Sequence, residues 1–179
     1  IVPTDQGPQV QRNPGAPGCV WFVNEIRWVN SPDEEIVALN DFNPVRTAVI
    51  DKAWQADLPS WQQLASSDSA ATIRLTDYPA PDRLLYESQS ASPRLAVFSE
   101  VFYKTWHAYI DGREVKPIRV DYILRGLEIP AGTHKIEFRC VDDVYLRSAR
   151  ISLIASIVVG VVFLALLGMA VRSAVVRKA

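Results

Sequence analysis

The chain has 179 residues, of which 49% are apolar and 22% charged, with 19 basic and 20 acidic side chains. This length accommodates one domain and a membrane segment, but not two large domains. The formal net charge of -1, without an arginine-rich run, argues against an electrostatic nucleic-acid binder, and 8 Gly, 12 Pro and 5 Trp fit neither a disordered tail nor a fibrous repeat.

The amino-terminal residues predict a linker followed by a strand. Residues 1–18 combine four prolines and three glycines with little apolar content, which predicts an extended linker without a core. Residues 19–29, CVWFVNEIRWV, show the period-two alternation of a strand. One face of this strand is assigned to Val20, Phe22, Ile26 and Trp28. Trp21 and Val23 make the other face apolar too, so we expect the strand to be covered on both sides.

A strand–helix–strand unit is predicted next. Ser31 and Pro32 supply a hydroxyl N-cap and a proline at the first helical position, and acidic residues fill the first turn. The expected buried stripe consists of Ile36, Leu39 and Phe42. Pro44 ends the helix near Asn43, because the residue before a proline disfavours helical geometry. Residues 46–51, RTAVID, predict a second strand, and the short crossover places the two strands parallel.

The rest of this region predicts antiparallel sheets. Residues 52–71 are expected to form a loop with a short helix over residues 61–65. Strands separated by turn signals follow over residues 72–77, 83–88, 94–102, 106–110, 113–118, 123–129 and 134–141. Asp111-Gly112 predicts a type I′ hairpin, and residues 130–132 predict the next tight turn. The predicted fold class is α+β and mainly β, an antiparallel β-sandwich with the strand–helix–strand unit attached, covering residues 19–147.

The carboxyl-terminal part predicts one transmembrane helix. Residues 151–171, ISLIASIVVGVVFLALLGMAV, carry no charge and as a helix would span about 31 Å, close to a hydrocarbon core of about 30 Å. A buried core helix would carry a polar stripe, which is missing here. The helix is assigned to residues 148–172, and Tyr145 is expected to anchor it at the interface. One helix face contains Ser152, Ser156, Gly160 and Gly168, which mark either a packing face for another span or plain lipid-facing sequence.

Charge bias sets the expected orientation of this helix. The last eight residues carry three basic side chains and no acidic one, whereas residues 1–150 carry the other 16 basic and all 20 acidic side chains. We therefore expect the basic tail, residues 173–179, in the cytoplasm and residues 1–147 outside it. A region of this length must be exported, yet the chain starts at Ile1 without an apolar signal core. We infer a piece of a longer protein whose earlier spans deliver the domain across the membrane.

Few residues qualify for chemistry. The two histidines, His107 and His134, have no carboxylate or cysteine at metal-ligand spacing, and no nucleophile elbow or phosphate-binding glycine loop is present. No catalytic, cofactor-binding or metal-binding residue is therefore assigned. The densest aromatic stretch is VFYKTWHAYIDG, residues 101–112. Its candidate glycan contacts are Trp106, His107 and Tyr109, because exposed aromatic rings stack on sugars; ordinary strand packing is the alternative.

Cys19 and Cys140 are the whole cysteine complement. In an oxidising compartment a disulfide between them would close a loop of about 120 residues. Free, buried thiols are the expected state, because Cys140 is in phase with core positions and nothing in the sequence fixes its distance from Cys19.

Three separated blocks of sequence resemble the carboxyl-terminal end of YfhO-type bacterial membrane proteins. They are WFVNEIRWVNSPDEEIVALNDFNPVRTAVID (residues 21–51), LAVFSEVFYKTWHAYIDGREV (95–115) and LRGLEIPAGTHKIEFR (124–139), followed by the apolar span. Members of that family are long polytopic proteins that resemble GT-C-type glycosyltransferases, which use lipid-linked sugars. Some are associated with glycosylation of cell-wall polymers.

The resemblance implies the extracytoplasmic accessory domain and last span of a membrane glycosyltransferase in the bacterial cytoplasmic (inner) membrane. The acidic catalytic residue of GT-C enzymes lies in an early exported loop, so this piece would hold no cofactor, and the longer protein would use a polyprenyl-phosphate-linked sugar. The implied partners are the lipid bilayer, other spans of the same protein and an envelope glycan. The alternatives are a non-enzymatic glycan- or protein-binding envelope module and a purely structural domain.

Overall fold

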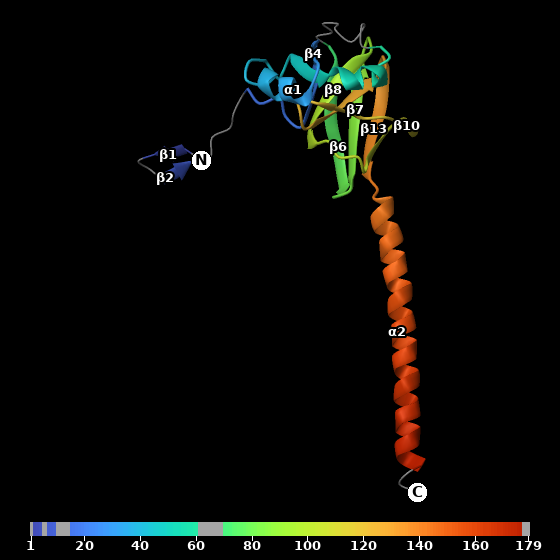
Figure 1. The fold of residues 1–179 in the computed structure, drawn as a ribbon. Helices are drawn as coiled ribbons and strands as arrows, with labels where there is room; N and C mark the ends of the chain where they lie inside the picture. Colours follow the sequence, from blue (N-terminus) through green and yellow to red (C-terminus); the bar gives the residue numbers. More distant parts are fainter. Residues whose placement is uncertain (1, 5–6, 10–14, 61–69, 177–179) are drawn as a thin grey trace. The chain divides into compact units, whose positions relative to one another are not determined.

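The computed structural model describes residues 2–4, 7–9, 15–60 and 70–176. The chain divides into two compact units, Ile1–Cys140 and Val141–Ala179. The strands of the described residues all lie in the first unit, and the second contains one long helix (Figure 1). The predicted class, mainly antiparallel β with an attached strand–helix–strand unit and one carboxyl-terminal apolar helix, is confirmed.

Two antiparallel sheets form the sandwich. The five-stranded sheet has the order β10 (Arg113–Val115), β9 (Trp106–Ile110), β13 (Gly132–Cys140), β7 (Arg83–Ser90) and β6 (Thr72–Ala80). The four-stranded sheet has the order β11 (Ile118–Val120), β12 (Leu124–Ile129), β8 (Arg94–Val101) and β3 (Val20–Val23). Between them lies a buried aromatic cluster in which Phe98 meets Tyr86 and Phe138 edge-to-face, with ring centres 4.9 and 4.8 Å apart. Edge-to-face packing of this kind contributes stabilisation beyond that of the area that the rings bury.

A third layer covers the other face of the four-stranded sheet. It consists of β4 (Glu25–Val29), α1 (Pro32–Ala38), β5 (Thr47–Asp51) and a 3₁₀ helix, η1 (Lys52–Asp57). β4 and β5 pair in parallel, as predicted from the short crossover. Ile50, Leu58 and Val97 are among the residues of the core between this layer and the sheet. The four-stranded sheet is therefore buried on both faces, which explains why β8 is apolar at successive positions.

The predicted strand over residues 19–29 is in fact two strands. The chain bends at Asn24, where the backbone N–H groups of Asn24 and Glu25 both donate to the carbonyl of Arg46, at 2.8 and 2.9 Å. Phe22 consequently packs in the sandwich core, whereas Ile26 packs in the core of the third layer. The single shared face predicted for these residues is wrong, but β3 is covered on both sides as expected.

Helix α1 begins as predicted and ends earlier. The Ser31 hydroxyl accepts a hydrogen bond from the backbone N–H of Glu34 at 3.2 Å, and the helix ends at Ala38 rather than near Asn43. Leu39 and Phe42 of the predicted stripe pack against the core as expected, but Ile36 is exposed and the charged Glu35 is fully buried. The physical reason is an ion pair, in which the Glu35 carboxylate lies 2.8 Å from the Arg119 guanidinium.

The residues that form turns determine where several other strands begin and end. Asp111 and Gly112 have φ of 51° and 80°, which confirms the predicted hairpin. The predicted strand over residues 113–118 is split into β10 and β11 at Lys116-Pro117. In the segment 52–71, for which a loop with a short helix is predicted, the structure has the 3₁₀ helix η1. The helix predicted over residues 61–65 falls outside the described residues. Within the predicted linker, β1 (Val2–Thr4) pairs with β2 (Gly7–Gln9) in an antiparallel hairpin.

The second unit contains helix α2 (Asp143–Val176). The Asp142 carboxylate caps its start, accepting hydrogen bonds from the backbone N–H groups of Val144 and Tyr145 at 3.0 Å each. The stretch Val144–Met169 is long and apolar enough to cross a membrane. The helix begins before residue 148, where the span was predicted to start, and it continues through residues 173–176 of the predicted tail. The expected role of Tyr145 as an interfacial anchor stays a prediction.

Candidate functional site: an aromatic groove

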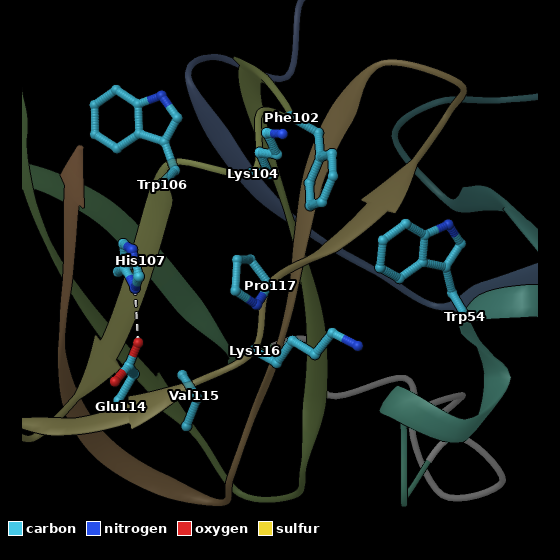
Figure 2. A pocket seen from close by; sticks show the side chains of 9 residues that line it. All are labelled: Trp54, Phe102, Lys104, Trp106, His107, Glu114, Val115, Lys116 and Pro117. Carbon is cyan, nitrogen blue, oxygen red and sulfur yellow. Dashed lines mark hydrogen bonds and ion pairs between the residues drawn. The ribbon is translucent and has the colours of Figure 1, made fainter. Parts of the chain in front are cut away.

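A groove of about 590 Å³ opens beside the β9–β10 edge of the five-stranded sheet. Its aromatic lining consists of Trp54, Phe102 and Trp106, and its polar lining of Lys104, His107, Glu114 and Lys116. Figure 2 shows Trp54 and Trp106 on opposite sides, with Phe102, Lys104 and Pro117 between them. The groove is therefore lined by residues of both the sandwich and η1 of the third layer, which come together only in the folded chain.

The Trp54 side of the groove is held by packing and charge. The rings of Trp54 and Phe102 meet edge-to-face with centres 5.3 Å apart. The ammonium of Lys116 lies 5.7 Å from the centre of the Trp54 ring and pairs with both carboxylate oxygens of Asp57, at 2.8 and 2.9 Å. A cation over an indole and an ion pair each restrict side-chain motion. This wall thus presents an ordered aromatic surface.

The floor of the groove carries a histidine–carboxylate pair. His107 on β9 and Glu114 on β10 are joined by a hydrogen bond of 2.7 Å between Nδ1 and Oε1, drawn in Figure 2. Both side chains project from the outer face of the sheet, because Glu114 is paired with Tyr109, two residues from His107. Exposed fractions of 38% and 59% leave both groups accessible to a ligand. The pair supplies a hydrogen-bond donor and an acceptor to anything that enters.

Trp106 lies between the groove and the sandwich interior. Its ring centre is 4.3 Å from the guanidinium carbon of Arg125, a side chain that is 1% exposed and also lies over Phe138. Glu100 accepts a hydrogen bond from this guanidinium at 2.9 Å. Burial lowers the pKa of Arg125, and the carboxylate of Glu100 opposes that shift. This arrangement fixes the orientation of the Trp106 indole at the groove.

Two of the three predicted glycan contacts line the groove and one does not. Trp106 and His107 are both lining residues. Tyr109 lies elsewhere on the outer face, where the Arg139 guanidinium stacks 4.8 Å from its ring centre. Trp54 was missed by the sequence reasoning, because it lies about fifty residues upstream of the aromatic stretch and no local pattern links the two.

His134 has a structural role. Its Nδ1 lies 2.6 Å from the Asp111 carboxylate and its Nε2 lies 3.1 Å from the carbonyl of Ala131. The hydrogen bond with Asp111 raises the pKa of His134 and lowers that of Asp111. His134 thus connects the tight turn at residues 130–132 to the Asp111-Gly112 hairpin.

The structure also bears on the two cysteines and on the small residues of α2. The thiols of Cys19 and Cys140 are free, and Cys19 is exposed rather than buried. On α2, the Ser156 hydroxyl donates to the Ser152 carbonyl at 2.8 Å. Apart from the backbone of the helix itself, no atom of the described residues lies within 4 Å of a Cβ added at Gly160 or Gly168. The packing face of the helix stays a prediction. Within the described ranges, no group of three or more His, Cys, Asp or Glu side chains could hold a metal ion.

Comparisons with models of protein families, with curated proteins and with solved structures found no match to this chain.

Proposed function

We propose that this chain is the membrane-anchored accessory domain of a polytopic bacterial protein, and that its aromatic groove holds an envelope glycan. The groove is the observation that carries the proposal. Its volume, about 590 Å³, falls within the range of roughly 300–1,000 Å³ that is usual for small-ligand sites. Its lining combines ring faces, which suit the apolar faces of sugars, with hydrogen-bonding groups at His107, Glu114 and Lys104.

The chemistry of the described residues favours binding over catalysis. Glu114 and His107 form one exposed pair, without a nucleophile beside them or a second carboxylate positioned as its partner. Glycoside hydrolases usually cut the glycosidic bond with a pair of carboxyl groups, which the described lining of this groove does not supply. We assign the transfer step, with its polyprenyl-phosphate-linked sugar, to earlier spans of the longer protein. In this proposal the domain binds the glycan that accepts the sugar.

The proposed location is the bacterial cytoplasmic membrane. Helix α2 provides the anchor, because Val144–Met169 has the length and composition of a spanning segment. The basic residues after the span favour a cytoplasmic tail, so that residues 1–147 lie outside the cytoplasm. An envelope glycan would then be present on the same side as the groove.

Glycan binding by the full chain in lipid nanodiscs tests the groove. We expect binding to a subset of bacterial envelope oligosaccharides on an array, and a loss of about tenfold or more with Trp54→Ala, because stacking of a ring on an aromatic side chain contributes on the order of 1–2 kcal/mol. Tyr109→Ala is the matched control, since this ring lies outside the groove. Equal losses in both variants, or no binding by the parent chain, would refute the proposal. Unchanged melting temperatures would show that both variants are folded.

Sugar transfer separates an accessory domain from an independent binding module. In the longer protein, supplied with a polyprenyl-linked donor and the bound glycan, Trp54→Ala should lower transfer while Tyr109→Ala should not. Transfer that is unaffected by Trp54→Ala, together with lost glycan binding, would contradict the accessory role and leave a module that binds glycans on its own.

A further inference from the structure

Exposed apolar side chains gather at one end of the sandwich. Val101, Tyr103 and Ile123 are 62%, 57% and 50% exposed. They are neighbours, because Val101 at the end of β8 pairs with Leu124 of β12, and the backbone N–H of Phe102 donates to the Ile123 carbonyl at 2.6 Å. With the exposed Lys104 they form a surface that we call the exit rim.

The exit rim lies where the chain leaves the sandwich. Trp106 is paired with Cys140, the last residue of β13, and its backbone N–H donates to the Tyr103 carbonyl at 3.0 Å. The apolar stretch of α2 begins at Val144. Four residues of chain allow at most about 14 Å between Cys140 and Val144, whatever path they take. A membrane that contains this stretch must therefore lie within reach of the rim.

The opposite end of the sandwich has a different surface. Its turns are Asp111-Gly112, residues 91–93 and residues 130–132. Within the described part of the chain, none of these turns contributes a large exposed apolar side chain. Among the described residues these turns thus lack the exposed apolar side chains of the exit rim, while Ile36, Val37 and Val45 are exposed elsewhere in this unit.

We propose that the exit rim rests in the lipid headgroup layer of the bilayer that α2 crosses. This inference depends on the membrane anchoring proposed above. Tyrosine and lysine are suited to this layer, where a ring reaches the acyl boundary and an ammonium meets anionic headgroups. Val101 and Ile123 together supply the apolar area of the exit rim. Phe102 and Lys104 also line the aromatic groove, so the rim would hold the groove beside the membrane surface.

Site-specific fluorescence in nanodiscs tests the rim. The full chain carries Cys19→Ser and Cys140→Ser, and a single new cysteine is introduced by Tyr103→Cys or Ile123→Cys and labelled with an environment-sensitive fluorophore. Ala131→Cys, an exposed position at the opposite end, is the matched control. The discs contain phosphatidylcholine and phosphatidylglycerol, with a nitroxide on a fraction of the headgroups. We expect the two rim labels to be quenched about twofold or more beyond the control label, as contact with the headgroup layer requires.

Three outcomes would overturn the proposal, and a label introduced by Val162→Cys separates them. Equal quenching at the rim and at Ala131, with the Val162 label quenched by acyl-chain nitroxides, would refute the rim contact and leave the anchor intact. Rim labels shielded from both lipid and aqueous quenchers would indicate a protein partner instead of lipid. A Val162 label that acyl-chain nitroxides do not reach would refute the anchor and the rim together.

Discussion

Asp121 and Val49 exchange two hydrogen bonds that tie the β11–β12 turn to β5. The backbone N–H of Asp121 donates to the Val49 carbonyl, and the Asp121 carboxylate accepts from the backbone N–H of Val49, both at 2.8 Å. The turn itself has left-handed backbone at Asp121 and Tyr122, with φ of 48° and 68°. This exchange joins the third layer to the sandwich through a carboxylate that is 5% exposed.

The buried carboxylate makes stability depend on pH. Burial, with a smaller contribution from the charge of Glu35, raises the pKa of Asp121 to about 6 against the opposing hydrogen bond from Val49. Because the folded state holds this proton more tightly than the unfolded chain, the contribution is complete below about pH 4 and is lost as pH rises through about 6. It is on the order of 3 kcal/mol. Burial also raises the pKa of Glu35, which adds a contribution of the same sign.

Asp121→Asn should remove most of this dependence. The amide oxygen keeps the hydrogen bond from Val49, and asparagine tolerates the left-handed backbone. We expect the variant to unfold at a higher temperature than the parent at about pH 8, and the difference to shrink at about pH 4. Melting of the full chain in detergent, followed by tryptophan fluorescence, measures both. A parent chain whose melting temperature stays flat over this range would contradict the assignment.

The buried guanidinium of Arg125 depends on Glu100. Its Nε and Nη1 lack hydrogen-bond partners within the described residues, while its Nη2 donates to Glu100. Glu100→Gln should destabilise the domain by about 1–2 kcal/mol, less than for a fully buried pair, because it leaves a buried charge without its counter-charge. Arg125→Met, which removes the charge and keeps the volume, should cost less. A larger loss for Arg125→Met than for Glu100→Gln would contradict this account, and urea unfolding in detergent measures the two.

Gly126 is required because side chains of the neighbouring strand β11 fill the space beside it. A Cβ at this position would lie 2.5 Å from Cγ1 of Val120, a fully buried core side chain. Gly126→Ala should therefore destabilise the domain by about 1–3 kcal/mol, as overpacking does. Val120→Ala removes the clashing atom, so the double variant should lose less stability than the sum of the two single losses. Strict additivity in thermal melts would show that the steric explanation is wrong.

Ser31 holds the start of the short helix α1. Its hydroxyl is the cap acceptor, and the Glu34 carboxylate in turn accepts a hydrogen bond from the backbone N–H of Asn30 at 2.8 Å. Ser31→Ala should lower the free energy of unfolding by about 1 kcal/mol, whereas Ser31→Asp should preserve it. Chemical denaturation of the three proteins provides the comparison. Similar losses for alanine and aspartate would mean that the cap contributes through something other than its acceptor oxygen.

Local sequence patterns predict the parts of this fold that local interactions determine. The Asp111-Gly112 hairpin, the cap at Ser31 and the apolar helix were all predictable, because each depends on neighbouring residues. The break at Asn24 was not, since it is created by the carbonyl of Arg46, which lies in the turn before β5. Glu35 is similar, because the groups that allow its burial, Arg119 and the backbone of Tyr122, lie more than eighty residues away.

The candidate site shows the same limit. Trp106 and His107 could be proposed because they occur together in one aromatic strand. The opposite wall could not, because Trp54 reaches the groove only when η1 packs beside Phe102. Tyr109 was proposed with the others, yet it lies under the Arg139 guanidinium and outside the groove, although it shares the outer face of β9 with His107. Assignments of this kind need the register between strands, which composition does not contain.

The position of β13 imposes an order on the biosynthesis of the domain. Although it is the last strand in the chain, β13 lies between β7 and β9 and pairs with both. Until the ribosome has released it, those two strands have unsatisfied edges that could pair with other nascent chains. Only two residues separate β13 from α2, so the strand that closes the sheet is synthesised immediately before the apolar helix.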